Sequence, residues 1–495
     1  MIEPILQYDH VTITYPNGHC AVRDVSLTIA PGECLALVGE SGCGKTTLAR
    51  AALGLLPAGT KVSGSIRVCG TEVVGAPASA LRKLRGLRAG FIAQDPFSAC
   101  DPLSNLYHHV AEAWRAHGLP LPLNQIINQV ESLGIADATN RLRQYPHEWS
   151  GGMLQRAGVA AAAAHHPSLL IADEPTSALD ADHAPTVLEL LRSFNASLLL
   201  ISHDLNLVTK HSDRIAVCLD GRIIESGSTS EILQRPQHPY TTKLLAASPS
   251  SQPGAFAPIS DKADVVVEAS GIGKAYGQNG NSIHAVRRVD LRVRRGEIVG
   301  ICGPSGCGKS TLLRILATIE TPTEGSIFLG GELATSARTN RLLSHNARNG
   351  FVMPIFQDPV SSLDRRWPIW RTVTEALMAK HRPEKPSREH RQSISLEFLR
   401  RVGLDAIAPE VRPGELSVGQ CQRVAIARAL VAEPKLIVAD EPTSALDAVI
   451  AASVLRLLKQ AADSGMGIVI VSHDRTLLDA LCNRVLEMRD GIILD

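Results

Sequence analysis

The segment GESGCGKTT at residues 39–47 fits the pattern GxxxxGK[ST], in which glycines precede a lysine and a hydroxyl residue. The segment GPSGCGKST at 303–311 fits the same pattern. Glycines let consecutive backbone N–H groups turn inward around a phosphate, and the following helix points its positive end at the same anion. Each segment follows an apolar run and precedes a helical one, which is the context that this loop requires. Both segments, called the phosphate loops here, are therefore predicted to bind a nucleotide.

Each phosphate loop also supplies side chains. Lys45 and Lys309 add a full positive charge beside the β- and γ-phosphates, and the hydroxyls of Thr46 and Ser310 are placed to ligate Mg²⁺. A single match can be a chance turn, but two in register make chance negligible. The residues predicted to contact ATP are Gly39, Glu40, Ser41, Gly42, Cys43, Gly44, Lys45, Thr46 and Thr47, with Gly303, Pro304, Ser305, Gly306, Cys307, Gly308, Lys309, Ser310 and Thr311. The thiols of Cys43 and Cys307 are either reactive or simply packed in the loop without reactivity.

Four further blocks recur in the same order with nearly constant spacing. They are AQDP (93–96) and FQDP (356–359), WSGGMLQR (149–156) and LSVGQCQR (416–423), IADEPTSALD (171–180) and VADEPTSALD (438–447), and ISHD (201–204) and VSHD (471–474). Self-similarity of this kind marks a repeated structural unit. The chain is therefore predicted to be a duplicated domain.

A change in composition marks the boundary between the two copies. The segment SPSSQPGAFAPIS is rich in Ser, Pro and Ala and has no charge, which is typical of an extended linker. We therefore expect a first domain at 1–244 with a tail from about 232, a linker at 245–264 and a second domain at 265–495. The apolar run that begins at Val265 is predicted to be the first strand of the second copy.

The local pattern predicts an α/β fold. Apolar runs such as Glu33–Val38 and Leu198–Ser202 alternate with helical stretches, which indicates a largely parallel sheet. Between the QDP block and the WSGG or LSVG block the sequence becomes helical, as in Tyr107–His117 and Ser387–Val402. Each half is therefore expected to carry a separate helical subdomain.

Composition narrows the classes of function. The 495 residues carry a formal net charge of +1, so the basic excess of a nucleic-acid-binding protein is missing. The longest nonpolar stretch, Ala157–Ala164, is far short of the roughly 20 residues that span a bilayer. The N-terminus shows no signal peptide. The ten cysteines are scattered without a CxxC pair, which favours reduced thiols over a zinc or iron–sulfur site.

An acidic pair ends an apolar run in each half. Asp173-Glu174 and Asp440-Glu441 follow four nonpolar residues and precede the segment PTSALD. The aspartates are placed to hold the Mg²⁺ shell, and the glutamates to orient or deprotonate the attacking water. An Asp-Glu pair elsewhere is usually a solvated pair of charges, but the buried strand before it makes that interpretation improbable here.

Taken together, the blocks of both halves resemble the nucleotide-binding domains of ABC ATPases. The resemblance implies tandem P-loop domains, each with a RecA-like α/β core and a helical subdomain. It also implies head-to-tail packing that places two ATPs between the domains. A first site would combine Lys45, Thr46, Gln94, Asp173, Glu174 and His203 with Ser417 and Gly419. A second would combine Lys309, Ser310, Gln357, Asp440, Glu441 and His473 with Ser150, Gly151 and Gly152.

The resemblance assigns roles within these sites. Glu174, His203, Glu441 and His473 would be catalytic, and Thr46, Gln94, Asp173, Ser310, Gln357 and Asp440 would hold Mg²⁺. Tyr15 and Tyr276 stand where the family places an aromatic ring against adenine, although a lone tyrosine is often packing. The histidines also admit a simple core role. The sequence departs from the family pattern at Trp149 and Met153, which replace the usual Leu and Gln, and at Val418, which replaces the first glycine of its block, closer to the nucleotide.

The segment HPYTTKLLAASP (238–249) resembles the C-terminal extension of ATPases that serve peptide and nickel importers. LGLLPAG (53–59) and SGGMLQR resemble the nickel branch, and GQCQR the oligopeptide branch. The expected function is to energise a bacterial importer of peptides, nickel or a small metal chelate by ATP hydrolysis. The expected partners are two hydrophobic permease subunits and a periplasmic binding protein, with the chain peripheral on the cytoplasmic face of the inner membrane.

Two other classes stay open. Soluble tandem ABC proteins act on ribosomes or in DNA repair, but this chain has neither a long charged helical linker nor zinc-binding cysteines. An accessory ATPase of a phosphonate-cleaving complex is the second alternative. Co-purification with hydrophobic permeases separates these possibilities.

Overall fold

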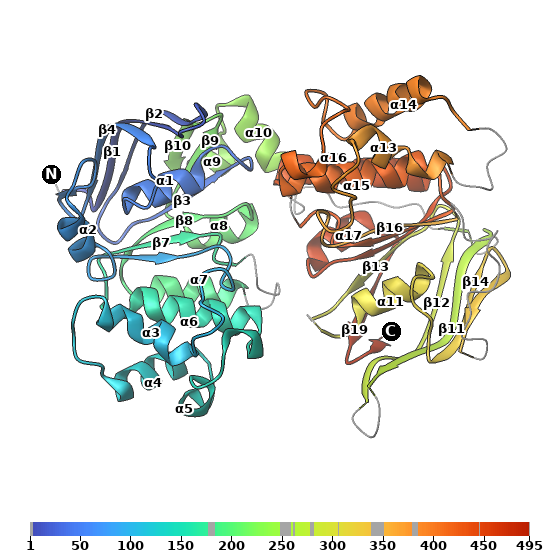
Figure 1. The fold of residues 1–495 in the computed structure, drawn as a ribbon, viewed down its shortest axis with the longest axis horizontal. Helices are drawn as coiled ribbons and strands as arrows, with labels where there is room; N and C mark the ends of the chain where they lie inside the picture. The colour runs from blue at the N-terminus through green and yellow to red at the C-terminus, as the bar shows by residue number, and fades with distance from the viewer. Residues whose placement is uncertain are drawn as a thin grey trace. The chain divides into compact units, whose positions relative to one another are not determined.

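The structure is a computed structural model that describes residues 3–176, 184–247, 259–260, 263–277, 282–304, 306–337, 351–378, 385–444 and 446–494. Ser305 and most of the predicted linker lie outside the described residues. The chain divides into two compact units, Met1–Ala246 and Ala247–Asp495. We describe each unit by itself (Figure 1).

The first unit alternates strands and helices, as its sequence predicts. Its elements are β1 (Leu6–Thr14), β2 (Cys20–Ile29), β3 (Cys34–Gly39), α1 (Lys45–Ala52), β4 (Lys61–Val68), β5 (Thr71–Glu72), α2 (Ala78–Leu84), β6 (Ala89–Ile92), α3 (Leu106–Arg115), α4 (Leu123–Ser132), α5 (Ala138–Arg141), the 3₁₀ turn η1 (Pro146–Glu148), α6 (Gly151–Ala163), β7 (Leu169–Asp173), α7 (Ala184–Ser193), β8 (Ser197–Ile201), α8 (Leu205–His211), β9 (Arg214–Leu219), β10 (Arg222–Ser228), α9 (Thr229–Gln234) and α10 (Pro239–Ala246).

Two sheets form the body of the first unit. A six-stranded sheet has the order β10-β9-β3-β8-β7-β6, and all its neighbours are parallel except β10 with β9. Strands β3, β7 and β8 are buried at every residue, as continuous apolar runs in a parallel sheet require. The second sheet is antiparallel with the order β2-β1-β4-β5. Helix α1 lies between the sheets, and one hydrophobic core joins all three (Figure 1).

The second unit repeats this architecture. Its elements are β11 (Val265–Tyr276), β12 (Ile283–Arg294), β13 (Ile298–Cys302), α11 (Lys309–Leu316), β14 (Glu324–Leu329), β15 (Glu332–Ser336), β16 (Val352–Ile355), α13 (Ile369–Val373), η3 (Glu375–Met378), α14 (Arg388–Arg401), η4 (Pro413–Glu415), α15 (Val418–Val431), β17 (Leu436–Asp440), α16 (Ala448–Asp463), β18 (Gly467–Val471), α17 (Arg475–Leu481), β19 (Arg484–Arg489) and β20 (Ile492–Leu494). Its sheet orders, β16-β17-β18-β13-β19-β20 and β12-β11-β14-β15, match those of the first unit strand for strand.

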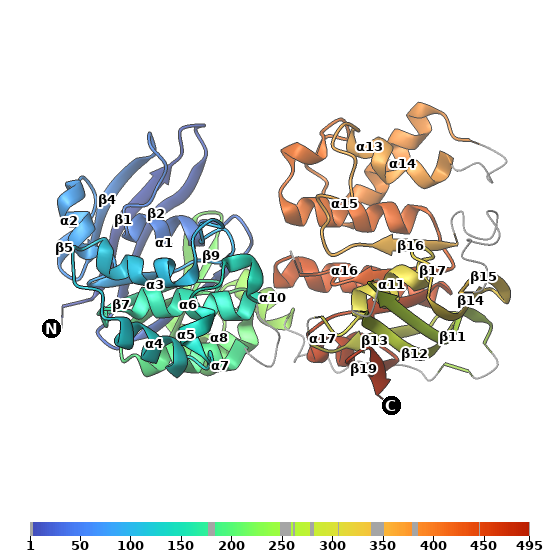
Figure 2. The same ribbon diagram turned by 60° about the horizontal axis from the view of Figure 1, so that its bottom comes forward.

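Each unit carries the expected helical subdomain beside one edge of its parallel sheet. Helices α3 to α6 pack together beside the edge strand β6 in the first unit, and α13 to α15 lie next to the edge strand β16 in the second (Figures 1 and 2). Within the described residues, no helix combines the length and apolar character needed to cross a membrane.

An arginine in each subdomain closes the end of a helix. Arg156 Nη1 donates to Leu133 O and Gly134 O after α4. Arg423 Nη1 donates to Val402 O and Gly403 O after α14. The last carbonyls of a helix lack intrahelical partners and carry a partial negative charge, so a guanidinium is well placed there. The two arginines therefore tie α6 to the end of α4 and α15 to the end of α14.

Candidate nucleotide site

The residues predicted to act on a nucleotide meet at one edge of each parallel sheet. In the first unit the phosphate loop follows β3, Gln94 follows β6, the Asp173-Glu174 pair ends β7 and His203 follows β8. In the second unit the same residue types follow β13, β16, β17 and β18. Ligands of open α/β sheets bind at the carboxyl ends of the strands. The fold thus brings together residues that lie far apart in the sequence.

One glycine in each phosphate loop is required by close packing. Gly44 begins α1 with φ 100°, and a Cβ there would lie 2.4 Å from the carbonyl oxygen of Ala21. Gly308 has φ 107°, and a Cβ would lie 2.0 Å from the carbonyl oxygen of Ala285. Only glycine combines a left-handed φ with so close a backbone approach. Glycine at these positions therefore lets the loop backbone lie against its neighbours in this turn.

The lysine of each loop is folded across its own backbone. Lys45 Nζ donates to Gly39 O at 2.9 Å and to Glu40 O at 2.7 Å. Lys309 Nζ donates to Gly303 O at 2.7 Å and to Pro304 O at 2.9 Å. Both lysines are buried. A buried cation at a helix N-terminus is a strong binding point for a phosphate group.

Oxygen atoms suited to Mg²⁺ lie next to the loop. Thr46 Oγ1 donates to Asp173 Oδ1 at 3.1 Å. Burial raises the pKa of the Asp173 and Asp440 carboxyls, so their charged forms lack compensation in the protein alone. Hydroxyl and carboxylate oxygens are the ligands that Mg²⁺ prefers, and a bound cation would supply the missing charge. In the second unit a cavity of about 380 Å³ lies beside these oxygen atoms, and Ser310 and Asp440 line it.

The glutamate of each acidic pair contacts an amide and an imidazole. Gln94 Nε2 donates to Glu174 Oε2 at 2.7 Å, and His203 Nδ1 lies 3.5 Å from Glu174 Oε1. Burial opposes ionisation of Glu174, but the hydrogen bond and charge of His203 and the charge of Lys45 outweigh it and lower the pKa of the carboxyl. The hydrogen bond to Glu174 raises the pKa of His203. An ionised carboxylate held in this way can orient a water molecule or accept its proton.

The backbone of these glutamates is strained. Glu174 has φ 48° and Glu441 has φ 46°, in the left-handed region that non-glycine residues avoid. Their N–H groups donate to Ile201 O and Val471 O, both at 2.9 Å, so the neighbouring strand holds the conformation in place. Local strain of this kind is concentrated at functional sites.

The predicted adenine-contacting tyrosines have different partners. The Tyr15 and Thr47 hydroxyls lie 2.9 Å apart. Tyr276 is 40% exposed and donates to Glu320 Oε1 at 2.7 Å, and Lys274 Nζ lies 5.3 Å from the centre of the Tyr276 ring. Both tyrosine rings are accessible at the antiparallel sheet, but Tyr276 also contacts the ion pair of Lys274 and Glu320.

The WSGG and LSVG blocks place their serines at helix N-termini. The Ser150 hydroxyl caps α6 by accepting from Met153 N, and the Ser417 hydroxyl caps α15 by accepting from Gln420 N. Gly151, Gly152 and Gly419 lie in the first turns of these helices. Val418 is the first residue of α15, and its side chain is 52% exposed. Because valine fits a helical backbone, its presence there causes no backbone strain.

Sequence reasoning missed two glutamines of the same blocks. Gln155 Nε2 donates to Ala93 O, next to Gln94, and Gln422 Nε2 donates to Pro442 O, next to Glu441. Both side chains are buried. They connect α6 and α15 to the segments that carry the candidate site. The signal was present in the sequence, because the pair Gln-Arg recurs at 155–156 and 422–423.

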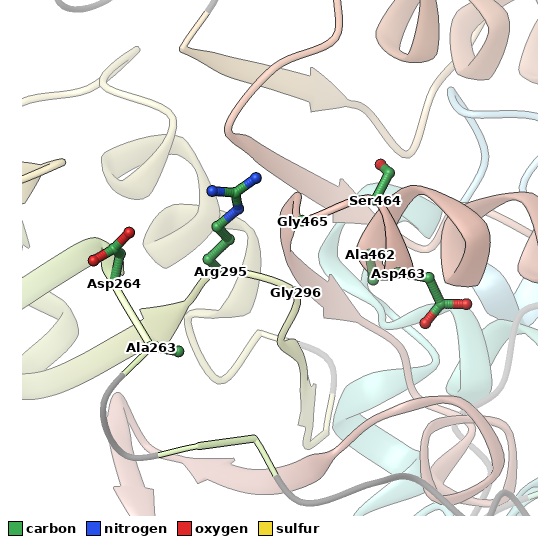
Figure 3. A pocket seen from close by; sticks show the side chains of 8 residues that line it. All are labelled: Ala263, Asp264, Arg295, Gly296, Ala462, Asp463, Ser464 and Gly465. Atoms are coloured by element: carbon green, nitrogen blue, oxygen red, sulfur yellow. The ribbon is translucent and has the colours of Figure 1, made fainter.

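A separate pocket in the second unit lies away from these residues. It is lined by Ala263, Asp264, Arg295, Gly296, Ala462, Asp463, Ser464 and Gly465 (Figure 3). Gly296 and Gly465 precede β13 and β18, so the pocket is at the amino ends of these strands. The pocket therefore lies at the amino ends of the strands, and the phosphate loop lies at their carboxyl ends.

Each unit thus has the fold and the site of a P-loop nucleotide-hydrolysing domain. A family model described as ABC transporter matches residues 22–177 and 286–444, and one described as the oligopeptide/dipeptide transporter C-terminal region matches 224–278. The chain belongs to the ABC transporter family and is an ABC-type ATPase with two tandem ATP-binding domains.

Known proteins extend this result along the whole chain. YejF of Escherichia coli (strain K12), named an uncharacterized ABC transporter ATP-binding protein, is 37% identical over 100% of this chain and 96% of its own length. A protein of Agrobacterium fabrum named peptidoglycan transport ATP-binding protein YejF is 35% identical over 100% and 92%. The structure of archaeal ribosome recycling factor aABCE1 with ribosomal stalk protein aP1 covers 98% of this chain and 89% of that chain, with a TM-score of 0.67 and 21% identity. At that identity the likeness shows the fold alone.

Proposed function

We propose that this chain energises a membrane importer of peptides or peptide-containing fragments by hydrolysing ATP. The observation that carries the proposal is the match to the oligopeptide/dipeptide transporter C-terminal region on a chain with two nucleotide sites. The name of the Agrobacterium fabrum relative, a peptidoglycan transport protein, supports the same substrate class. Nickel and metal chelates are the less favoured cargo, because neither the description of the C-terminal family model nor the name of this relative refers to them.

The tail behind this match is folded into the first unit. Ser228 and Glu231 form a capping box at the start of α9. Gln237 N and His238 N then donate to the Glu225 carboxylate at 2.7 and 3.1 Å. Tyr240 and Leu244 of α10 are buried. The segment is therefore an ordered part of the ATPase, which suits a surface that serves a particular class of transporter.

The proposed mechanism assigns a task to each element of the site. The loop N–H groups and Lys45 or Lys309 bind the β- and γ-phosphates. Thr46 with Asp173, and Ser310 with Asp440, hold Mg²⁺ together with Gln94 and Gln357; the ion supplies charge neutralisation at the phosphates. Glu174 and Glu441 orient and deprotonate the attacking water, and His203 and His473 position the glutamates and the γ-phosphate. Tyr15 and Tyr276 contact adenine.

Each site is proposed to be completed by the opposite unit. The N-terminus of α15, with Ser417 and Gly419, would contact the ATP held by Lys45. The N-terminus of α6, with Ser150, Gly151 and Gly152, would contact the ATP held by Lys309. Helix N-termini are suited to this because their free N–H groups and positive dipole ends favour phosphate. One chain then contains both composite sites.

We further propose that one chain docks on two permease subunits at the cytoplasmic face of the inner membrane and works with a periplasmic binding protein. Purification of the full chain with its permeases, followed by mass measurement of the complex, tests this stoichiometry. One ATPase chain per permease pair is expected. Two chains per pair, or no permease association, contradicts the proposed assembly.

Reconstitution of the complex in liposomes tests the cargo. Binding protein loaded with a short peptide should stimulate ATP hydrolysis and drive peptide uptake, whereas nickel salts should do neither. Stimulation by nickel alone, or by ribosomes in the absence of permease, would instead favour the corresponding alternative. A complex that carries both Glu174→Gln and Glu441→Gln provides the control for uptake that does not depend on hydrolysis.

A further inference from the structure

Two cysteines meet beneath the phosphate loop of the first unit. Cys43 belongs to the loop, and Cys218 belongs to the adjacent strand β9, where it pairs with Gly39. The Cys218 thiol donates to the carbonyl oxygen of Cys43 at 2.9 Å. A Cβ on Gly39 would lie 3.2 Å from Cys43 Sγ and 2.0 Å from Cys218 O. Both cysteines therefore pack around the same glycine at the base of the loop.

The second unit lacks one of these thiols. Cys307 occupies the loop position, and a Cβ on Gly303 would lie 3.0 Å from Cys307 Sγ. The backbone carbonyl that faces Gly303 belongs to Met488, at 2.1 Å from the same Cβ. Met488 of β19 thus stands where the first unit has Cys218. The two units can therefore be compared within one chain: the first has two thiols at this place, Cys43 and Cys218, and the second has only the Cys307 thiol.

The charges around the first loop favour reaction at Cys43. Lys45 Nζ lies 3.7 Å from Cys43 Sγ. Hydrogen bonding between the Cys43 and Cys218 side chains lowers the pKa of the Cys43 thiol; burial opposes this, and the charge of Lys45 adds to it. The same interaction between the two side chains, together with burial, raises the pKa of the Cys218 thiol. A thiolate beside a protonated partner thiol is the usual arrangement of a nucleophilic and a resolving cysteine.

We propose that Cys43 and Cys218 form a site of reversible oxidation to an intrachain disulfide, with a hydroperoxide as the oxidant. The Cys43 thiolate attacks one peroxide oxygen, the O–O bond breaks, and Cys43 becomes a sulfenic acid while the other oxygen leaves as water or alcohol. The Cys218 thiol then attacks the Cys43 sulfur, the S–O bond breaks, and a water molecule leaves. The two thiols lose two electrons, and the peroxide gains them.

The disulfide would act on one nucleotide site only. It ties the phosphate loop to β9, so the loop can no longer adjust its N–H groups and Lys45 around a phosphate. The loop of the second unit, with Cys307 and Met488, stays free. Both Cys43 and Cys218 are buried in the protein. Since a nucleotide bound to the loop would cover Cys43 further, bound MgATP is expected to slow the oxidation.

Peptide mapping of the full chain tests the proposal. The protein is treated with hydrogen peroxide, its free thiols are blocked with iodoacetamide, and it is digested without reduction. A Cys43–Cys218 linked peptide pair is expected in the mass spectrum, together with loss of photolabelling of the first loop by an azido-ATP probe. Labelling of the second loop should persist, and dithiothreitol should reverse both changes. Oxidation of Cys43 without the linked pair overturns the proposal.

Two variants sharpen the test. Cys218→Ser keeps a hydroxyl that can donate to the Cys43 carbonyl, so the untreated protein should bind nucleotide normally and its first loop should keep its photolabelling after peroxide. Met488→Cys introduces the missing thiol, and the second loop should then form a linked pair and lose labelling. If the wild type and Cys218→Ser lose first-loop labelling equally, the dithiol is not the reason for the loss.

Discussion

His473 Nδ1 lies 3.0 Å from Glu441 Oε1, and in the first unit the same pair, His203 and Glu174, is 3.5 Å apart. In each case the histidine follows one buried strand, and the glutamate comes directly after the strand paired with it. The contact joins neighbouring strands at the edge where the phosphate loop lies. The histidine therefore holds the direction of the carboxylate at this end of the sheet.

The contact predicts that His473→Ala lowers kcat for ATP hydrolysis. The variant removes a donor from Glu441, and the loss of one preorganised donor typically costs about 10²-fold or more. Steady-state ATPase assays at saturating MgATP measure the effect. His10→Ala is the matched control, because His10 also lies 2.8 Å from a carboxylate, that of Asp24, but is exposed on the antiparallel sheet. Equal losses in the two variants would contradict a role at the site.

The two nucleotide sites are predicted to be equivalent despite Val418. Its backbone is helical and its side chain is half exposed, so Val418→Gly should leave the ATPase rate unchanged. Glu174→Gln and Glu441→Gln should lose similar fractions of the rate, because each removes a carboxylate that we propose activates water. Steady-state assays on the three variants decide this. A gain from Val418→Gly with greater loss from Glu441→Gln would show that hydrolysis runs mainly at the Lys309 site.

Asp173→Asn should separate the stability of the nucleotide-free protein from its stabilisation by Mg²⁺. Burial raises the pKa of Asp173, so the stability linked to this group is present at low pH and is lost as the pH rises through the raised pKa. At neutral pH the asparagine removes that cost, and the nucleotide-free variant should unfold at the same temperature as the wild type or higher. The additional stabilisation by MgATP over ATP with EDTA should disappear. Thermal unfolding with and without Mg²⁺ measures both; a retained Mg²⁺ effect counts against a metal role.

Arg423→Met should weaken the helical subdomain of the second unit. The guanidinium donates to Gly403 O at 2.7 Å after α14, and its loss should cost about 1–2 kcal/mol. Calorimetry of the full chain should show a lower unfolding temperature for this variant. Arg401→Met is the control, because the exposed pair of Arg401 with Glu397 contributes about 0.5 kcal/mol or less. A smaller shift for Arg423→Met than for Arg401→Met would contradict the capping role.

The sequence by itself determined the duplication, the α/β class and most of the candidate site. GxxxxGK[ST] is readable because the loop is continuous, and its glycines are required by backbone contacts that any such loop makes. The strands before Asp173 and Asp440 are readable because a parallel sheet buried on both faces needs uninterrupted apolar runs. The helices predicted at 107–117 and 387–402 are confirmed as α3 and α14, within two residues at each end.

Only the tertiary structure decided which side chains touch. The recurring blocks single out Gln94, Gln155 and Arg423 in the sequence. Their contacts with Glu174, Ala93 and Gly403 join segments that are distant in the sequence, so motif spacing does not show which partner each side chain meets. The pairing of Cys43 with Cys218 depends on β9 lying next to β3, although the two strands are separated by most of the unit. Such contacts follow from strand order, which the chain settles through packing of the whole sheet rather than through any one segment.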